Sequence, residues 1–141
     1  MNHTYSNYSL GYDPEEAYKS ETNAFGFTIA VNKDSLCGKT SWRLPNSTEL
    51  SSMFICPSGL DPVGWSLSCS VGSIYVSDSY FSESPIKNKT YFPNSISGEY
   101  WSSSSNSNYE TLGSVVDFSS GELDSIRREH FYPVRLVSDG D

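Results

Sequence analysis

The segment Trp42-Arg43-Leu44-Pro45-Asn46-Ser47-Thr48-Glu49 constrains the fold more than any other part of the chain. Asn46 followed three positions later by Glu49 is a capping box, in which each side chain accepts a hydrogen bond from the other residue's backbone N–H. A helix is therefore predicted to begin at Asn46, just after Pro45, which cannot continue a strand ladder. The helix is expected to be roughly nine residues long and to depend on packing for stability. Pro57 would end it, and its apolar face would carry Leu50, Met53 and Phe54.

Two further segments have helical character. Apolar residues recur at helical spacing from Thr22 to Asn32, although Gly26 costs about 1 kcal/mol there relative to alanine. Asp13-Pro14-Glu15-Glu16 resembles a turn that feeds a helix, with proline at the first helical position. Between Pro57 and Ser97 no helical period is found, and Gly, Pro, Ser and Asp interrupt the segment, so we expect a long irregular insertion.

The C-terminal part has the residues of a β-sheet. Valine, leucine and aromatic residues predict three strands, at Glu99 to Ser103, Ser114 to Phe118 and Phe131 to Val137. The turn Ser119-Ser120-Gly121 follows the second strand, and Glu122 to His130 is expected to be a charged connection. No internal repeat or clear linker occurs in the sequence, so we predict one domain over residues 1–141, of α+β class.

The charge balance limits the partners of this chain. It has 9 Lys and Arg residues against 17 Asp and Glu residues, a net charge of −8. Each phosphate contact needs a basic side chain, so the balance argues against nucleic acid and against an anionic membrane surface. No apolar run approaches the length needed to cross a membrane. Neutral glycans, cationic partners and calcium remain open.

The three cysteines form no C-x-x-C pair, which argues against a zinc ribbon or a thioredoxin-like site. Cys56 and Cys69 bracket a segment rich in Gly, Pro and Ser, and a disulfide there would staple a segment with little core of its own. We predict this bridge for an oxidising compartment, with Cys37–Cys56 as the competing pairing. Under the first pairing, Cys37 is either free and buried or paired with something outside this chain.

Five short runs occur in an order that is similar to a known family. They are Cys37 to Leu50 (CGKTSWRLPNSTEL), Tyr91 to Asn94 (YFPN), Tyr100 to Ser104 (YWSSS), Val115 to Gly121 (VVDFSSG) and Pro133 to Val137 (PVRLV). Over roughly residues 22 to 137, the chain resembles the Legionella collagen-like adhesin C-terminal domain family, long catalogued as a bacterial domain of unknown function.

The resemblance implies a C-type-lectin-like fold, with two helices packed on a twisted antiparallel sheet and a long loop region above. It also implies a secreted or cell-surface location, often at the tip of a stalk or pilus, and a role in adhesion and glycan binding. Two departures stand out. Ser41 occupies a position where the family usually has Asp, and the usual first strand is missing. The strand at Phe131 to Val137 would then have an open edge, covered by the Tyr-rich N-terminus or by another chain.

Candidate site residues fall into two groups. The first group is expected to secure the fold, with the tryptophans in the core and Arg43 fixing the loop before the helix through a carboxylate or backbone carbonyls. It comprises Trp42, Arg43, Pro45, Asn46, Glu49, Trp101, Asp117 and Arg135. The second group lies in two polar segments whose amides, carboxylates and rings suit sugar hydroxyls and apolar sugar faces. It comprises Asn106, Asn108, Tyr109, Glu110, Asp124, Arg127 and Arg128.

Metal and catalytic sites are less favoured. Calcium would need clustered oxygen ligands, and the acidic residues have no EF-hand spacing; they are Glu99, Glu110, Asp117, Glu122 and Asp124. Only His3 and His130 could act as histidine bases, and no G-x-S-x-G motif marks a nucleophile. We therefore expect no cofactor and no enzyme.

The leading hypothesis is an extracellular bacterial recognition domain that binds a glycan or a surface protein through its loops. The alternative is a structural assembly or pilus-tip module that takes a strand from another chain, as a homo-oligomer or with a partner. A lectin-fold enzyme is the least favoured interpretation.

Overall fold

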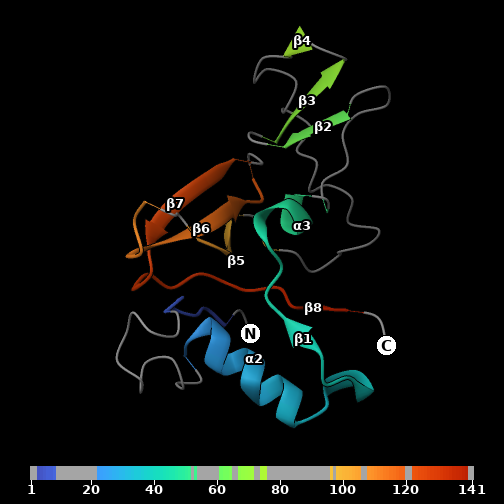
Figure 1. The fold of residues 1–141 in the computed structure, drawn as a ribbon, viewed down its shortest axis with the longest axis vertical. Coiled ribbons are helices and arrows are strands. Elements are labelled where there is room, and N and C mark those ends of the chain that lie inside the picture. Colours follow the sequence, from blue (N-terminus) through green and yellow to red (C-terminus); the bar gives the residue numbers. More distant parts are fainter. Residues whose placement is uncertain are drawn as a thin grey trace.

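The computed structural model of the chain describes residues 3–8, 22–51, 53, 61–64, 67–71, 74–75, 96, 98–105, 108–119 and 122–139. These residues form a mixed α+β structure with two short helices and antiparallel sheets (Figure 1), which confirms the predicted class. The elements before the main sheet are α2 (Ala24–Lys33), the 3-10 turn η1 (Leu36–Gly38), β1 (Trp42–Arg43), α3 (Ser47–Ser51), β2 (Asp61–Gly64), β3 (Leu67–Val71) and β4 (Ile74–Tyr75). The remaining strands are β5 (Glu99–Ser105), β6 (Leu112–Asp117), β7 (Leu123–Arg127) and β8 (Val137–Ser138).

Helix α2 confirms the helix predicted between Thr22 and Asn32. Asn23 caps it, because its side-chain oxygen accepts hydrogen bonds from the backbone N–H groups of Phe25 (2.9 Å) and Gly26 (3.3 Å). At the other end, the Asn32 side chain donates to the carbonyl of Trp42 (2.8 Å) and accepts from its N–H (2.7 Å). This pair of bonds fixes strand β1 beside the helix.

Helix α3 begins as the capping box predicts. The Asn46 N–H donates to Glu49 Oε2 and the Glu49 N–H donates to Asn46 Oδ1, both at 2.8 Å. The helix spans five residues, fewer than the roughly nine expected. It closes early because the N–H of Met53 turns to the carbonyl of Leu50 in a tighter, i to i+3 bond. Phe54 and Pro57 lie outside the described residues.

The main sheet has the strand order β5-β6-β7, and all its pairs are antiparallel. Strands β5 and β6 confirm the two strands predicted around Trp101 and Val115. The prediction of a charged connection from Glu122 to His130 is wrong, because Leu123–Arg127 pairs with β6 as an edge strand. An edge strand tolerates charge on its open side: Asp124 and Arg127 are exposed, whereas Leu123 is half-buried.

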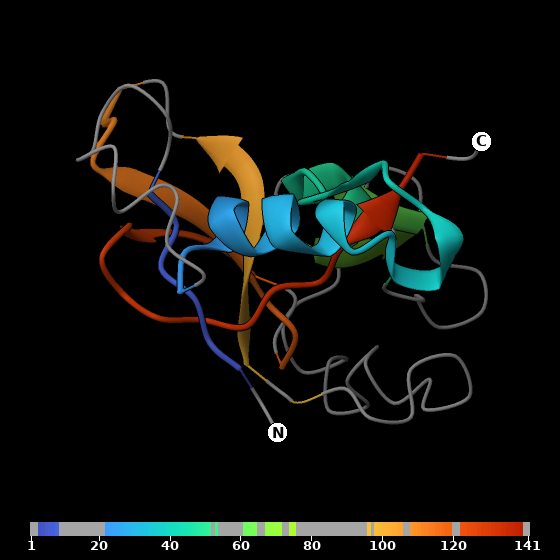
Figure 2. The same ribbon diagram turned by 90° about the horizontal axis from the view of Figure 1, so that it is seen from below.

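The two faces of this sheet pack against different elements, since side chains alternate along each strand. Tyr100 and Val116 face one way and form a core with Leu50 of α3 and Phe118. Trp101 and Val115 face the other way and are fully buried. Residues 3–8, named here the N-terminal arm, run along that second face beside the C-terminal segment (Figure 2).

The segment Phe131 to Val137 is not the single long strand that was predicted. Pro133 has no N–H to contribute, and Tyr132 and Val134 form only isolated bridges before β8 pairs with β1. The edge is nevertheless covered. Tyr5 of the arm and Tyr132 exchange both backbone hydrogen bonds, at 2.8 and 3.0 Å. Of the two coverings expected for this edge, the Tyr-rich N-terminus is the one present.

The predicted irregular insertion contains regular structure. Strands β2, β3 and β4 form a separate antiparallel sheet, in which Pro62 lies on edge strand β2, where a missing N–H is tolerated. The expectation that Pro57 to Ser97 is irregular throughout is therefore wrong. The helix start predicted at Asp13-Pro14-Glu15-Glu16 lies outside the described residues.

Candidate binding site

Arg43 links helix α3 to the C-terminal segment through carboxylates, one of the two kinds of partner expected for it in the loop before the helix. Its guanidinium donates to both oxygens of Glu49, at 2.8 and 2.7 Å, and to both oxygens of Asp139, at 2.8 and 2.5 Å. These bonds raise the pKa of Arg43 and lower the pKa of Glu49 to about 2, with a smaller contribution from the Asn46 backbone. The pKa of Asp139 is also lowered, chiefly by its bond to Arg43.

Ser41 lies beside this network. Its hydroxyl is 2.9 Å from that of Ser138 and donates to the carbonyl of Asp139 (3.2 Å). The family resemblance leads one to expect an aspartate at position 41, next to Arg43. In this chain Asp139, which is 96 residues away from Arg43, supplies a second carboxylate instead.

Trp42 and Trp101, the two tryptophans expected to secure the fold, have different environments. Trp101 is fully buried, and its indole N–H donates to the carbonyl of Tyr5 (2.6 Å). Trp42 is only half-buried, and its indole N–H donates to the carbonyl of Leu36 (2.9 Å). The expectation that both fill the core is therefore wrong for Trp42, which instead ties turn η1 to strand β1.

Three other residues of the group expected to secure the fold make contacts within the structure. Pro45 is buried, and its carbonyl accepts a hydrogen bond from the N–H of Ser103 (2.8 Å). Asp117 accepts from the N–H of Ser119 (2.7 Å) and so shapes the turn that begins the β6–β7 hairpin. The guanidinium of Arg135 lies 5.1 Å from the ring centre of Tyr100 and also faces Phe118, in cation–π geometry.

The predicted ligand-binding residues are only partly brought together. Asn108, Tyr109 and Glu110 are exposed in the turn between β5 and β6, and Arg127 lies at the same end of the sheet, since it pairs with Leu112. Asp124 pairs opposite Val115, farther along β7. Asn106 lies outside the described residues.

Arg128 belongs with the structural residues rather than the ligand-binding ones. It is buried, its Nε donates to the carbonyl of Glu110 (2.7 Å), and its Nη1 donates to the carbonyl of Asn7 (2.9 Å). A guanidinium used in this way is not presented to solvent. Arg128 therefore holds the β5–β6 turn and the N-terminal arm in place together.

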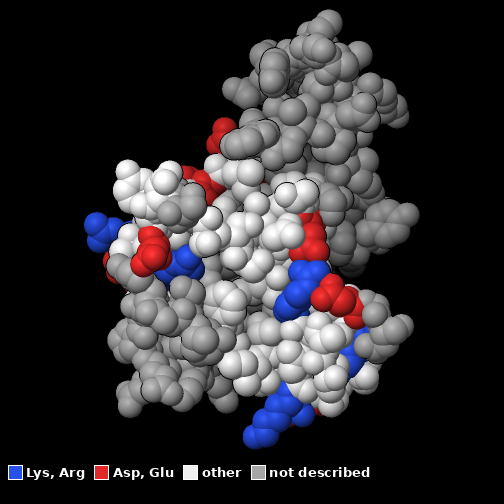
Figure 3. All heavy atoms as spheres, viewed as in Figure 1, with Lys and Arg blue, Asp and Glu red and all other residues white. Residues whose placement is uncertain are grey.

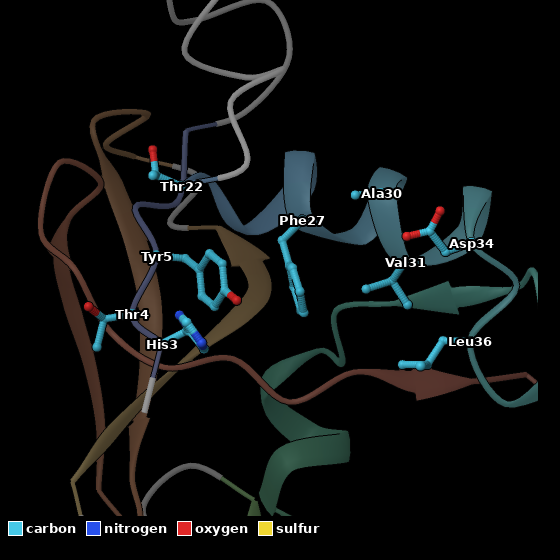
Figure 4. Close-up of a pocket in the computed structure, with 9 residues that line it drawn as sticks. All are labelled: His3, Thr4, Tyr5, Thr22, Phe27, Ala30, Val31, Asp34 and Leu36. Atoms are coloured by element: carbon cyan, nitrogen blue, oxygen red, sulfur yellow. The ribbon is translucent and has the colours of Figure 1, made fainter. Parts of the chain in front are cut away.

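A hollow that the sequence did not predict lies between the N-terminal arm and helix α2. We name it the arm–helix groove, and its volume is about 550 Å³, within the range of small-ligand sites. Figure 4 shows His3, Tyr5 and Phe27 directed toward the same space, with Val31 and Leu36 at the far end. The groove is lined by His3, Thr4, Tyr5, Thr22, Phe27, Ala30, Val31, Asp34 and Leu36.

One wall of the groove is the N-terminal arm, which is firmly held. Tyr5 pairs with Tyr132, and Ser6 bonds through its backbone to Thr22 (2.9 Å) and to Ala24 (2.8 Å). Asn7 is buried, and its amide donates to the carbonyl of Ser102 (3.3 Å). A wall built on bonds to three separate segments keeps its geometry without a ligand.

The other wall is one face of α2. Phe27, Ala30, Val31 and Asp34 follow the i, i+3, i+4, i+7 spacing that places side chains on one helical face. The rings of Tyr5 and Phe27 stack across the junction, with centres 4.6 Å apart and planes inclined by 27°. Burial raises the pKa of the Tyr5 hydroxyl. The helix spacing was visible in the sequence, and the Tyr-rich N-terminus was one of the two coverings expected for the C-terminal edge. The groove between the arm and the helix was not predicted.

The lining combines an apolar floor with polar ends. Phe27, Ala30, Val31 and Leu36 supply the floor, while His3, Thr4 and Thr22 lie at the arm end and Asp34 at the opposite end (Figure 4). Among the described residues that line the groove, none is lysine or arginine. Such a lining can bind a partly apolar molecule that carries hydroxyl groups.

Charge and metal-ligand chemistry are sparse in the described part of the chain. On the face seen in Figure 3, basic and acidic side chains lie in small mixed groups rather than in a patch of one sign. Within the described ranges, no three His, Cys, Asp or Glu residues are grouped so as to hold a metal ion. The helices described there are all too short or too polar to cross a membrane.

Cys37 is free and exposed in turn η1, so the expectation of a buried thiol is wrong, and the competing Cys37–Cys56 bridge is not formed. Cys56 lies outside the described residues, and the Cys56–Cys69 bridge stays a prediction.

Residues 3–138 match the family described as the Lcl C-terminal domain. The chain belongs to this family. The match begins at His3 and so includes the N-terminal arm, which the resemblance over residues 22–137 had left out. Membership relates the chain to the domains of collagen-like adhesins. Among curated proteins and among solved structures, none matches it.

Proposed function

We propose that this chain is an extracellular recognition domain of a bacterial surface adhesin and that it binds a glycan or a surface protein without catalysis. Membership in the Lcl C-terminal domain family over residues 3–138 carries the proposal. We also propose the C-type-lectin-like arrangement for the fold. Its support is the pairing of the N-terminal arm with the C-terminal segment through Tyr5 and Tyr132, with α3 packed on the β5-β6-β7 sheet and α2 beside β1.

The surface offers rigidly held contact groups of the kind that recognition needs. Tyr109 is 61% exposed on the β5–β6 turn, next to the amide of Asn108 and the carboxylate of Glu110. Arg128 fixes that turn from beneath through the Glu110 carbonyl. An exposed ring flanked by polar groups on a fixed turn is favourable, because little conformational freedom is lost on binding.

A glycan array tests the proposal directly. The domain is displayed as a tetramer, because a single shallow site binds weakly and linking several copies raises the apparent affinity. A monomer on the same array should bind at least about tenfold more weakly. An array without a reproducible hit, together with no binding of the tetramer to cultured cells, would exclude the glycan and the surface-protein versions.

The assembly alternative receives less support from the geometry. The edge at Phe131 to Val137 is already covered by the arm. On the outer edge of β7, the Asp124 carboxylate accepts the N–H of Ser125 (2.7 Å), which removes a donor that an added strand would use. The assembly alternative would be favoured by light scattering that shows a concentration-dependent dimer. The substitution Ser125→Pro should then abolish that dimer.

A non-catalytic role is consistent with the two histidines. Both His3 and His130 are exposed, and neither imidazole hydrogen-bonds to a hydroxyl or thiol of another described residue. A nucleophile and its base normally lie within hydrogen-bonding reach of each other.

A further inference from the structure

We propose that the arm–helix groove, rather than the β5–β6 turn, is the primary sugar site of this domain and that it holds one uncharged pyranose ring. The inference rests on the proposed glycan-binding function and assigns it a place and a ligand class. It is carried by the lining, in which an apolar floor on α2 lies between polar groups at the two ends.

The floor matches the apolar side of a sugar ring. One face of many pyranoses presents C–H groups, which pack on aromatic and aliphatic side chains. Phe27 is half-buried and directed into the groove, with Ala30 and Val31 one turn further along the same helical face (Figure 4). Its stacking on Tyr5 holds the ring in one orientation, so the platform exists before the ligand arrives.

The ends match the hydroxyl groups. A hydroxyl that enters an apolar site without a hydrogen-bond partner is penalised, so a sugar needs polar groups around its rim. Asp34 is exposed at one end and offers two acceptor oxygens that can bind neighbouring hydroxyls. At the other end, the exposed His3 is directed toward the groove and offers an imidazole (Figure 4).

The charge of the lining selects the class of sugar. Among the described residues that line the groove, Asp34 is the acidic member and none is basic. A uronic acid or a sulfated sugar would therefore place a second negative charge near this carboxylate, with no cation among the described lining residues to compensate it. A neutral hexose or N-acetylhexosamine meets no such penalty.

The test uses the whole chain and defined probes. Methyl glucopyranoside, methyl galactopyranoside, methyl mannopyranoside and methyl N-acetylglucosaminide are titrated into ¹⁵N-labelled protein, and amide shifts are followed. We expect shifts concentrated in residues 3–5 and 27–36 for at least one of them. Methyl glucuronide, which differs from the glucoside by its carboxylate, should bind more weakly.

Two groove variants, one variant of the β5–β6 turn and one control separate the outcomes. Asp34→Asn removes the carboxylate charge at an exposed position, and Phe27→Ala removes the platform. Each should weaken binding by about three- to tenfold, which corresponds to the loss of one polar or apolar contact. Ile29→Ala, on the same helix but outside the groove, should bind as the unchanged protein does. Tyr109→Ala, on the β5–β6 turn, should weaken binding less than either groove variant.

The failures of the two proposals are distinguishable. If a glycan binds but Tyr109→Ala abolishes binding while Asp34→Asn and Phe27→Ala do not, the groove assignment is overturned and the recognition function stands. If the glucuronide binds as tightly as the glucoside, the assignment to uncharged sugars is overturned. If no pyranoside shifts the groove and no array glycan binds the tetramer, the groove assignment and the glycan version of the proposed function fail together.

Discussion

Gly113 lies at the point where the N-terminal arm meets the main sheet. A methyl group built there would lie 2.8 Å from Asn7 Nδ2 and 2.9 Å from Trp101 Cζ3. Carbon atoms pack at roughly 3.5 Å, so the Trp101 ring would have to yield by about 0.6 Å. That ring is fully buried, bonded to the Tyr5 carbonyl and in edge contact with Tyr132, so it has little room to move.

The magnitude follows from two opposing effects. Overpacking a close-packed site costs about 1–3 kcal/mol. Replacing glycine by alanine restricts the unfolded chain and returns about 0.4–1 kcal/mol, because the backbone of Gly113 is not in the left-handed region. We therefore expect Gly113→Ala to lower the free energy of unfolding by about 1–2 kcal/mol, which corresponds to roughly 3–6 °C in Tm.

Urea unfolding followed by tryptophan fluorescence measures this effect, with Ser103→Ala on the exposed side of β5 as the matched control. The midpoint should fall in Gly113→Ala and stay unchanged in the control. Amide exchange in residues 3–8 should also accelerate, because a displaced Asn7 loses its bond to Ser102. A Gly113→Ala protein as stable as the original, with a protected arm, would refute this account of the junction.

Two further predictions concern the start of helix α3. Asn46→Ala removes the acceptor of the Glu49 N–H and should destabilise the protein by about 1 kcal/mol in urea, whereas Asn46→Ser should retain most of the cap. Because the folded-state pKa of Glu49 is about 2 and its ordinary value is 4.5, the stability that its ionised form provides is present above pH 4.5 and is lost as the pH falls toward 2. Glu49→Gln should lack that part of the acid dependence in urea midpoints measured at a series of pH values, and parallel curves would contradict it.

The sequence by itself determined the elements whose causes lie within a few residues. The capping box joins Asn46 to Glu49 over three positions, and the start of α3 follows from that spacing alone. The same holds for α2 and for strands β5 and β6, whose residue patterns match the structure. Family membership was also carried by short runs in the sequence, and the match over residues 3–138 confirms it.

The tertiary structure decided whatever depends on residues far apart in the chain. Arg128 was predicted to bind a ligand, but its side chain is buried. It donates a hydrogen bond to the carbonyl of Asn7, which is 121 residues away. Strand β7 looked like a charged connection because its pairing to β6 leaves one side open to water. Asp139, which is 96 residues away from Arg43, is the second carboxylate to which the Arg43 guanidinium donates hydrogen bonds.

The arm–helix groove shows the same limit most clearly. Its floor was visible as an apolar row on α2, but a row of this kind normally packs into a core. Whether it does so depends on what lies opposite, and here that is an arm whose position is fixed by its bonds to Tyr132, Thr22 and Ser102. Local spacing fixes which side chains share a face, whereas long-range hydrogen bonds fix whether that face is covered or left open.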